Sequence, residues 1–321
     1  MDKNLFEKYY KTAEDIQTEI RKVVLGKDDI IEKILAAVLA GGHVLLDDIP
    51  GVGKTTLALA FSYATNMDYR RMQFTPDVLP TDVTGFTIYD KKTDSFQYKE
   101  GVAMCNLFLA DEINRTSSKT QSALLELMEE GKVTVDGVNH PLPNPYIVIA
   151  TQNPIGSVGT QMLPDSQLDR FMTCVSMGYP SVADEVEILK GRQGKNPLDD
   201  VVAVASKDDI VTMRNLVKEV YTDDKIYTYI AEIADETRKN PMIKLGLSPR
   251  GSLALARISR AVAFLHGRNY VIPDDVSFIF FDVACHRIEL SPKAKISGVT
   301  AKEVLTQLLN NVKAPKIEKG N

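Results

Sequence analysis

The segment Gly51-Val52-Gly53-Lys54-Thr55 stands between a short apolar run and a helical pattern, and few folds can accommodate it there. Its glycines let the backbone wrap closely around a phosphate, while successive N–H groups and a helix N-terminus supply positive potential. Lys54 is placed to neutralise the β- and γ-phosphates, and the Thr55 hydroxyl is placed to bind Mg²⁺. The segment therefore predicts a P-loop that binds ATP and Mg²⁺ through Pro50, Gly51, Val52, Gly53, Lys54, Thr55 and Thr56.

Position 48 departs from the strict P-loop pattern, which has a glycine where this chain has Asp48. Because backbone atoms make most of the phosphate contacts, an Asp48 side chain that points outward is compatible with the loop. The alternative is an ordinary glycine-rich turn. The strand expected before the segment and the helix expected after it favour the P-loop.

Five short apolar runs alternate with helical patterns over residues 1–180. They are rich in Val, Ile, Leu and Phe, as buried parallel strands are. The alternation predicts an α/β fold, with a parallel five-stranded sheet between helices. The expected strands are His43–Leu46, Arg70–Phe74, Asn106–Ala110, Tyr146–Ala150 and Met172–Met177, and expected helices include Thr55–Thr65 and Ser117–Glu130.

Two β-hairpins are expected as insertions in this series. Residues Lys132–His140 alternate around Asp136-Gly137, a strong signal for a two-residue turn. Phe86–Tyr89 and Ser95–Tyr98 flank a polar turn and form the second candidate. Binding a nucleotide requires neither hairpin, so they predict an additional role.

The pattern changes after Pro180, and nearly everything to about residue 312 is typical of helices. We therefore predict a nucleotide-binding core at residues 1–180 and an all-α lid domain at residues 181–321. The expected lid helices are Val182–Lys190, Lys207–Glu219, Asp224–Lys239, Pro249–His266, Pro273–Arg287 and Ala301–Asn310.

Two acidic residues, Asp111 and Glu112, end the third apolar run. Asp111 is placed to hold Mg²⁺, and Glu112 is placed to orient or deprotonate an attacking water molecule. Such a pair is common by chance at strand ends, where the plain interpretation is a solvated pair. Its position after a P-loop favours nucleotide hydrolysis over phosphate transfer to an acceptor.

Two further segments are candidates for contact with the nucleotide. Asn153 follows the fourth apolar run, so its amide would reach the sheet edge where ligands of such sheets bind. From the local sequence alone, Asn153-Pro154 is a turn signal. Val24 and Gly26 precede the first strand and are expected near the adenine, unless Gly26 simply ends a helix.

Charge and composition limit the class of function. The net charge is −5 and the pI about 5.5, which disfavours a protein whose main role is to grip nucleic acid. The sequence shows neither a signal-peptide core nor an apolar run long enough to span a bilayer. We expect a cytoplasmic protein without direct membrane insertion.

These elements, in this order, resemble the AAA+ ATPases of the MoxR family over nearly the whole chain. The resemblance implies a P-loop NTPase core with β-hairpin inserts and a helical lid, and the acidic residue at position 48 is common in the family. The motifs that carry it are Leu45–Thr56, Gln73–Asp82, Ala110–Arg115 with Lys119–Glu126, Ala150–Pro154, Leu168–Phe171 and Leu247–Arg250.

The resemblance assigns roles to matching positions. Lys54 and Thr55 correspond to Walker A, Asp111 and Glu112 to Walker B, and Asn153 to sensor 1. Arg170 corresponds to an arginine finger for the neighbouring subunit, and Arg250 to sensor 2, which reaches ATP from the lid. Without the resemblance, Arg170 would be interpreted as a local ion pair with Asp165 or Asp169, and Arg250 as a solvated residue. Arg115 is a further candidate to act across an interface.

The resemblance also implies a homo-oligomeric ring, typically a hexamer, in which both hairpins face a central pore. It implies a chaperone-like role in maturing or activating partner protein complexes, including by metal or cofactor insertion. A separate protein with a von Willebrand factor A domain is an expected partner. The alternatives are a nucleic-acid motor, suggested by Lys91, Lys92, Phe96 and Tyr98, and a nucleotide-gated scaffold with negligible turnover.

Overall fold

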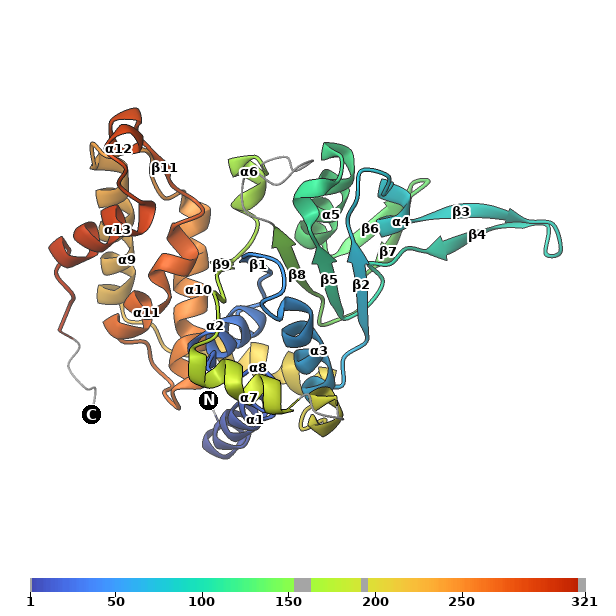
Figure 1. Ribbon diagram of the computed structural model, residues 1–321, viewed down its shortest axis with the longest axis horizontal. Coiled ribbons are helices and arrows are strands. Elements are labelled where there is room, and N and C mark those ends of the chain that lie inside the picture. Colours follow the sequence, from blue (N-terminus) through green and yellow to red (C-terminus); the bar gives the residue numbers. More distant parts are fainter. Residues whose placement is uncertain (1, 153–162, 192–195, 317–321) are drawn as a thin grey trace.

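The computed structural model describes residues 2–152, 163–191 and 196–316, and its centre is a five-stranded parallel sheet (Figure 1). The strand order is β2-β5-β8-β1-β9, so β1 lies between β8 and the edge strand β9. All five predicted strands are confirmed, with ends shifted by one or two residues. They are β1 (Val44–Asp47), β2 (Tyr69–Gln73), β5 (Leu107–Asp111), β8 (Ile147–Gln152) and β9 (Thr173–Val175).

Helices cover both faces of this sheet, because successive strand residues point to opposite faces. Leu46 of β1 faces the buried cluster that includes α1 (Lys3–Arg21), α2 (Asp28–Leu39) and α3 (Lys54–Thr65). Leu45, its neighbour in β1, faces the second cluster, which includes α5 (Ser118–Glu130). The helices α3 and α5 therefore lie on opposite faces.

The N-terminal region contains two helices, α1 (Lys3–Arg21) and α2 (Asp28–Leu39), whose bounds were not predicted from the sequence. Asp2 caps α1, since its side chain accepts hydrogen bonds from Asn4 N and Leu5 N. Phe6, Tyr9, Ala13, Ile16 and Ile20 are buried at helical spacing and form the face of α1 that packs on the core.

Both predicted hairpins are present. The longer one, β3 (Gly85–Asp90) and β4 (Ser95–Glu100), extends well away from the body of the molecule (Figure 1). The shorter one consists of β6 (Lys132–Val135) and β7 (Val138–Pro141), which pair antiparallel around the predicted turn.

The part of the chain after Pro180 is mainly helical, as predicted, and it packs against the N-terminal helices. One buried cluster runs continuously from α1 and α2 into the C-terminal helices, so the domain boundary at residues 180–181 stays a prediction. The remaining elements are α4 (Pro80–Thr84), η1 (Ile113–Arg115), α6 (Asp165–Leu168), α7 (Val182–Gly191), η2 (Pro197–Asp200), α8 (Lys207–Glu219), α9 (Asp224–Lys239), β10 (Ile243–Leu245), α10 (Pro249–Leu265), α11 (Pro273–Ala284), β11 (Glu289–Leu290), α12 (Pro292–Ile296) and α13 (Ala301–Asn311).

Candidate functional site

The predicted P-loop connects the end of β1 to the start of α3. Gly51 and Gly53 have φ values of +87° and +95°, in the left-handed region that favours glycine. Lys54 is 7% exposed, and its Nζ donates to the backbone oxygen of Asp48 at 2.7 Å. Burial lowers the pKa of Lys54, while nearby carboxylates, led by Asp48, oppose this shift. The loop is thus folded into a cradle, and its buried lysine is the cation that a phosphate would meet.

The Asp48 side chain points inward, not outward as the sequence interpretation had allowed. Its carboxylate accepts hydrogen bonds from the backbone N–H groups of Met177 and Gly178, the latter at 3.1 Å. These two residues follow β9, where the strand no longer provides acceptors for their N–H groups. Asp48 therefore ties the P-loop to the segment that leaves the sheet.

The predicted acidic pair lies at the end of β5, next to Thr151 of β8. The Thr151 hydroxyl donates to Asp111 Oδ1 at 2.6 Å and accepts from Glu112 N at 2.8 Å. The other Asp111 oxygen, Oδ2, accepts from Arg71 Nη2 at 2.7 Å. A threonine side chain therefore fixes the orientation of both acidic residues.

Glu112 has an unusual backbone conformation, with φ at +58°. For a residue with a side chain this costs roughly 1–3 kcal/mol and is concentrated at functional sites. Its Oε2 forms an ion pair with Arg115 Nη1 at 2.8 Å. Arg115, a candidate to act across an interface, here contacts the acidic residue of its own chain.

The donor set around Asp111 fits Mg²⁺ when a nucleotide supplies further ligands. Mg²⁺ takes one or two protein oxygen ligands together with phosphates and water. Asp111 and the half-buried Thr55 are the candidates. Within the described residues, no group of three or more His, Cys, Asp or Glu side chains could hold a metal without such help.

The other two predicted nucleotide contacts are less fully described. Asn153 lies outside the described residues. Gly26 has φ at +66° and packs against α7, where an added Cβ would lie 2.1 Å from Asp184 Oδ2. Because α1 ends at Arg21 with Lys22 as its C-cap, Gly26 is not the residue that ends this helix. Val24 is buried beside it, and the adenine contact of both stays a prediction.

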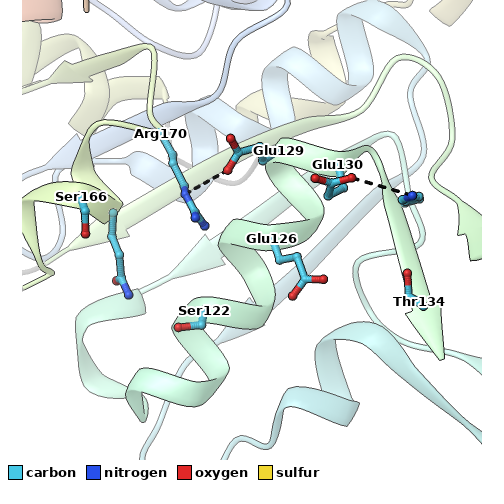
Figure 2. A pocket seen from close by; sticks show the side chains of 9 residues that line it. Ser122, Glu126, Glu129, Glu130, Thr134, Ser166 and Arg170 are labelled. Atoms are coloured by element: carbon cyan, nitrogen blue, oxygen red, sulfur yellow. Dashed lines mark ion pairs between the residues drawn. The ribbon is translucent and has the colours of Figure 1, made fainter. Parts of the chain in front are cut away.

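The two predicted ATP-directed arginines converge on one carboxylate. Glu129, near the end of α5, forms an ion pair with Arg170 Nε at 3.3 Å (Figure 2). It forms a second one with Arg250 Nη2. Arg170 pairs with neither Asp165 nor Asp169 among the described ion pairs, so the local alternative was wrong. A cavity of about 630 Å³ beside this cluster is lined by Arg170 and glutamates of α5.

This arginine cluster lies at the N-terminal ends of the parallel strands, whereas the P-loop lies at their C-terminal ends. Arg170 precedes β9, the P-loop follows β1, and these two strands are parallel neighbours. Glu129 lies near the same strand ends as Arg170, because the carbonyl of the adjacent Met128 contacts the ring of His43, which precedes β1. Arg170 and Arg250 are therefore held away from the P-loop of their own chain.

Comparison with known proteins identifies the family. Residues 43–173 match the model of the ATPase family associated with various cellular activities (AAA), and residues 235–308 match the AAA lid domain. The chain is 48% identical over 296 residues to the uncharacterized protein YeaC of Bacillus subtilis, covering 92% of each. It is 35% identical over 315 residues to the chaperone MoxR1 of Mycobacterium tuberculosis, covering 95% of this chain and 83% of that one. The chain belongs to the MoxR family of AAA ATPases.

A solved structure supports the same assignment. The crystal structure of a candidate ATPase from Cytophaga hutchinsonii superposes with a TM-score of 0.90 at 34% identity, covering 98% of each chain. As a MoxR-family AAA ATPase, the chain binds and hydrolyses ATP. Among the described residues, no helix is both long and apolar enough to cross a membrane.

Sequence reasoning missed several residues of this MoxR-family site. Arg71 and Thr151 reach Asp111 only in the folded chain, and Glu129 likewise reaches Arg170 only there. Thr151 lies within the Ala150–Pro154 motif, which was a usable signal, since a hydroxyl at the strand end could have been expected beside Asp111. Arg71 and Glu129 carry no local signal, because charged residues on a strand and a helix are common.

Proposed function

We propose that this chain is a Mg²⁺-dependent ATPase that works as a homo-oligomeric ring, a hexamer, and remodels partner protein complexes in a chaperone-like way. In this proposal Lys54 and Thr55 hold ATP and Mg²⁺, Asp111 holds Mg²⁺, and Glu112 activates the attacking water. Asn153 would help to position that water.

The placement of Arg170 and Arg250 carries the proposal of a ring. Both guanidinium groups are partly exposed and lie at the N-terminal ends of the strands, away from their own P-loop. An arginine at a splitting γ-phosphate stabilises spreading negative charge and is worth about 10³–10⁵ in rate in GTPases. Both arginines therefore suit the ATP of a neighbouring subunit, so that each interface forms one complete site.

The β3–β4 hairpin is the candidate for contact with a client protein. Phe96 near its tip is 76% exposed, and Tyr89 and Ile88 are also exposed. Exposed apolar side chains clustered on an extended element mark interaction surfaces. We propose that ATP turnover moves this hairpin against a client complex, with a separate von Willebrand factor A domain protein as a partner.

Replacement of Glu112 by glutamine tests the hydrolytic part of the proposal. Glu112→Gln keeps the size of the side chain but removes the base, so kcat should fall about 100-fold or more while ATP binding persists. Wild-type turnover should also stop when Mg²⁺ is removed with EDTA. Unchanged turnover in Glu112→Gln would refute the assigned role of this residue.

The same variant tests the ring and the client. In ATP, Glu112→Gln should accumulate as a hexamer by native mass spectrometry and should retain partner proteins in affinity capture. A monomer at high protein concentration would contradict the ring. Turnover stimulated by DNA or RNA would instead support a nucleic-acid motor, and negligible wild-type turnover would support a scaffold.

A further inference from the structure

Arg287 of the C-terminal region is buried to an extent unusual for an arginine. Its side chain is 2% exposed, although it follows the end of α11. Burial lowers the pKa of Arg287, and the carboxylate of Asp169 opposes this shift most strongly. A cation is placed so deeply only where its hydrogen bonds are all satisfied.

Arg287 forms hydrogen bonds with residues on both sides of Arg170 in the sequence. Nε donates to Asp169 Oδ1 at 2.7 Å, and Nη2 donates to the backbone oxygens of Asp169, at 3.2 Å, and Phe171. Nη1 donates to the backbone oxygen of Met172 at 3.0 Å. One guanidinium thus binds the residue before Arg170 and the two residues after it.

A second contact joins the same segment to α10. The Ser248 hydroxyl donates to Asp169 Oδ2 at 3.2 Å, and Ser248 is the N-cap of α10, whose first turn contains Arg250. Glu129 then binds the side chains of both Arg170, as Figure 2 shows, and Arg250. The C-terminal helices therefore fix the backbone of Arg170, and Glu129 of the core fixes its side chain.

A purely structural role is the alternative explanation for Arg287. A buried ion pair is weak evidence for stability, because an apolar replacement often serves as well. Nη1 also contacts Val283 O and His286 Nε2 of its own region. A purely structural role does not account for the other four acceptors, which all lie on the segment that carries Arg170. The fork of an arginine can bridge several acceptors, which the ammonium group of a lysine cannot do.

We propose that Arg287 is a positioning residue for Arg170, and that it makes the C-terminal helices and the arginine finger move as one unit. The proposal rests on the proposed function, in which Arg170 acts on the ATP of a neighbouring subunit. Through Arg287, the nucleotide state of the neighbour is passed to the C-terminal helices of this subunit.

The test compares Arg287→Lys with Arg268→Lys. Arg268 makes a similar ion pair with the buried Asp275 in the same region but is not bonded to the Arg170 segment, so it is a matched control. Arg287→Lys should lower kcat about 10- to 100-fold, as expected for a misplaced reacting group, with the Kd for ATP within about 2-fold. Arg268→Lys should leave kcat unchanged.

Mixing experiments distinguish a displaced finger from a general defect. Arg287→Lys subunits should regain turnover when mixed with Glu112→Gln, because they still supply an intact Glu112. They should not regain it when mixed with Arg170→Ala, because neither variant then supplies a working finger. A general defect of folding would give no recovery in either mixture.

Three results would overturn the proposal: wild-type kcat in Arg287→Lys, recovery with Arg170→Ala, or failure to recover with Glu112→Gln. If Arg287→Lys does not fold, Asp169→Asn tests the same contact from the core side with the same mixtures. Unfolding of both variants, with Arg268→Lys intact, would assign Arg287 a structural role. Wild-type turnover in Arg170→Ala would instead refute the finger itself, and with it the proposed function.

Discussion

The carboxylate of Asp48 joins the P-loop to the chain that follows β9. Glycine at this position would complete the strict P-loop pattern but would leave the N–H groups of Met177 and Gly178 without these acceptors. Lys54 bonds to the backbone oxygen of Asp48, so that contact does not depend on the side chain. The aspartate thus adds a support for the loop that the consensus pattern lacks.

We predict that Asp48→Gly lowers the free energy of unfolding by about 1–3 kcal/mol, because two backbone donors lose a charged acceptor. ATP affinity should fall too, since the loop is less firmly preorganised. Urea denaturation and titration with a fluorescent ATP analogue measure the two effects. Asp48→Asn keeps one acceptor oxygen, so its stability and its ATP affinity should lie between those of the wild type and the glycine variant. A glycine variant as stable as the wild type would contradict this role.

His43 gives a prediction about pH. Its Nδ1 accepts from Val148 N and its Nε2 contacts Met128 O, both at 3.0 Å, so the neutral ring satisfies both contacts. Burial lowers the pKa of His43 to about 4, from an ordinary value of 6.5. Its contribution to stability is therefore present above pH 6.5 and is lost as the pH falls toward 4, by about 3 kcal/mol.

Urea denaturation of the wild type and of His43→Gln between pH 7 and pH 4 checks this prediction. Burial also lowers the pKa of His286, to about 3, so both proteins should lose stability in acid. The glutamine variant should lose less, by the His43 contribution. If the two proteins lost equal stability between pH 7 and pH 4, His43 would not take up a proton when the protein unfolds in acid.

At the scale of elements, the β3–β4 hairpin depends on a close backbone approach at its base. Gly85 has φ at +85°, and a Cβ added there would lie 2.3 Å from the backbone oxygen of Lys99. Gly137, in the turn of the β6–β7 hairpin, has φ at +80° but open space around its Cβ position. The two glycines therefore differ in crowding, although both have a positive φ.

We predict that Gly85→Ala loosens the long hairpin far more than Gly137→Ala loosens the short one. Both variants carry a backbone cost of about 1–2 kcal/mol, and Gly85→Ala adds the clash with Lys99. Hydrogen exchange measures the effect in residues 85–100 of Gly85→Ala and in residues 132–141 of Gly137→Ala, and ATP binding should persist in both variants. An equal loss of protection in the two hairpins would contradict the prediction.

At the scale of the whole molecule, the parallel sheet, the hairpins and the C-terminal helices followed from local pattern. The strand ends were placed to within two residues, because alternation and turn signals act over short distances. The convergence of Arg170 and Arg250 on Glu129 could not be predicted, since it joins three elements far apart in sequence. The inward orientation of the Asp48 side chain was missed for the same reason, because its carboxylate accepts hydrogen bonds from residues that follow β9.

That convergence leads to a prediction about the assembled ring, in which each complete site needs Glu112 from one subunit and Arg170 from the next. Glu112→Gln and Arg170→Ala should each be nearly inactive. A mixture in equal amounts should regain up to about a quarter of wild-type turnover, because random assembly places the two intact residues at about one interface in four. Recovery should peak at equal amounts and fall on either side.

The mixing ratio separates this model from its rivals. If Arg170 served the P-loop of its own chain, every subunit in the mixture would lack one essential residue and no ratio would recover turnover. If all sites had to hydrolyse ATP in sequence around the ring, turnover would stay far below a quarter of the wild-type value, because a single incomplete interface would stop the cycle. A maximum near equal amounts is thus expected only when Arg170 acts across the interface and sites turn over independently.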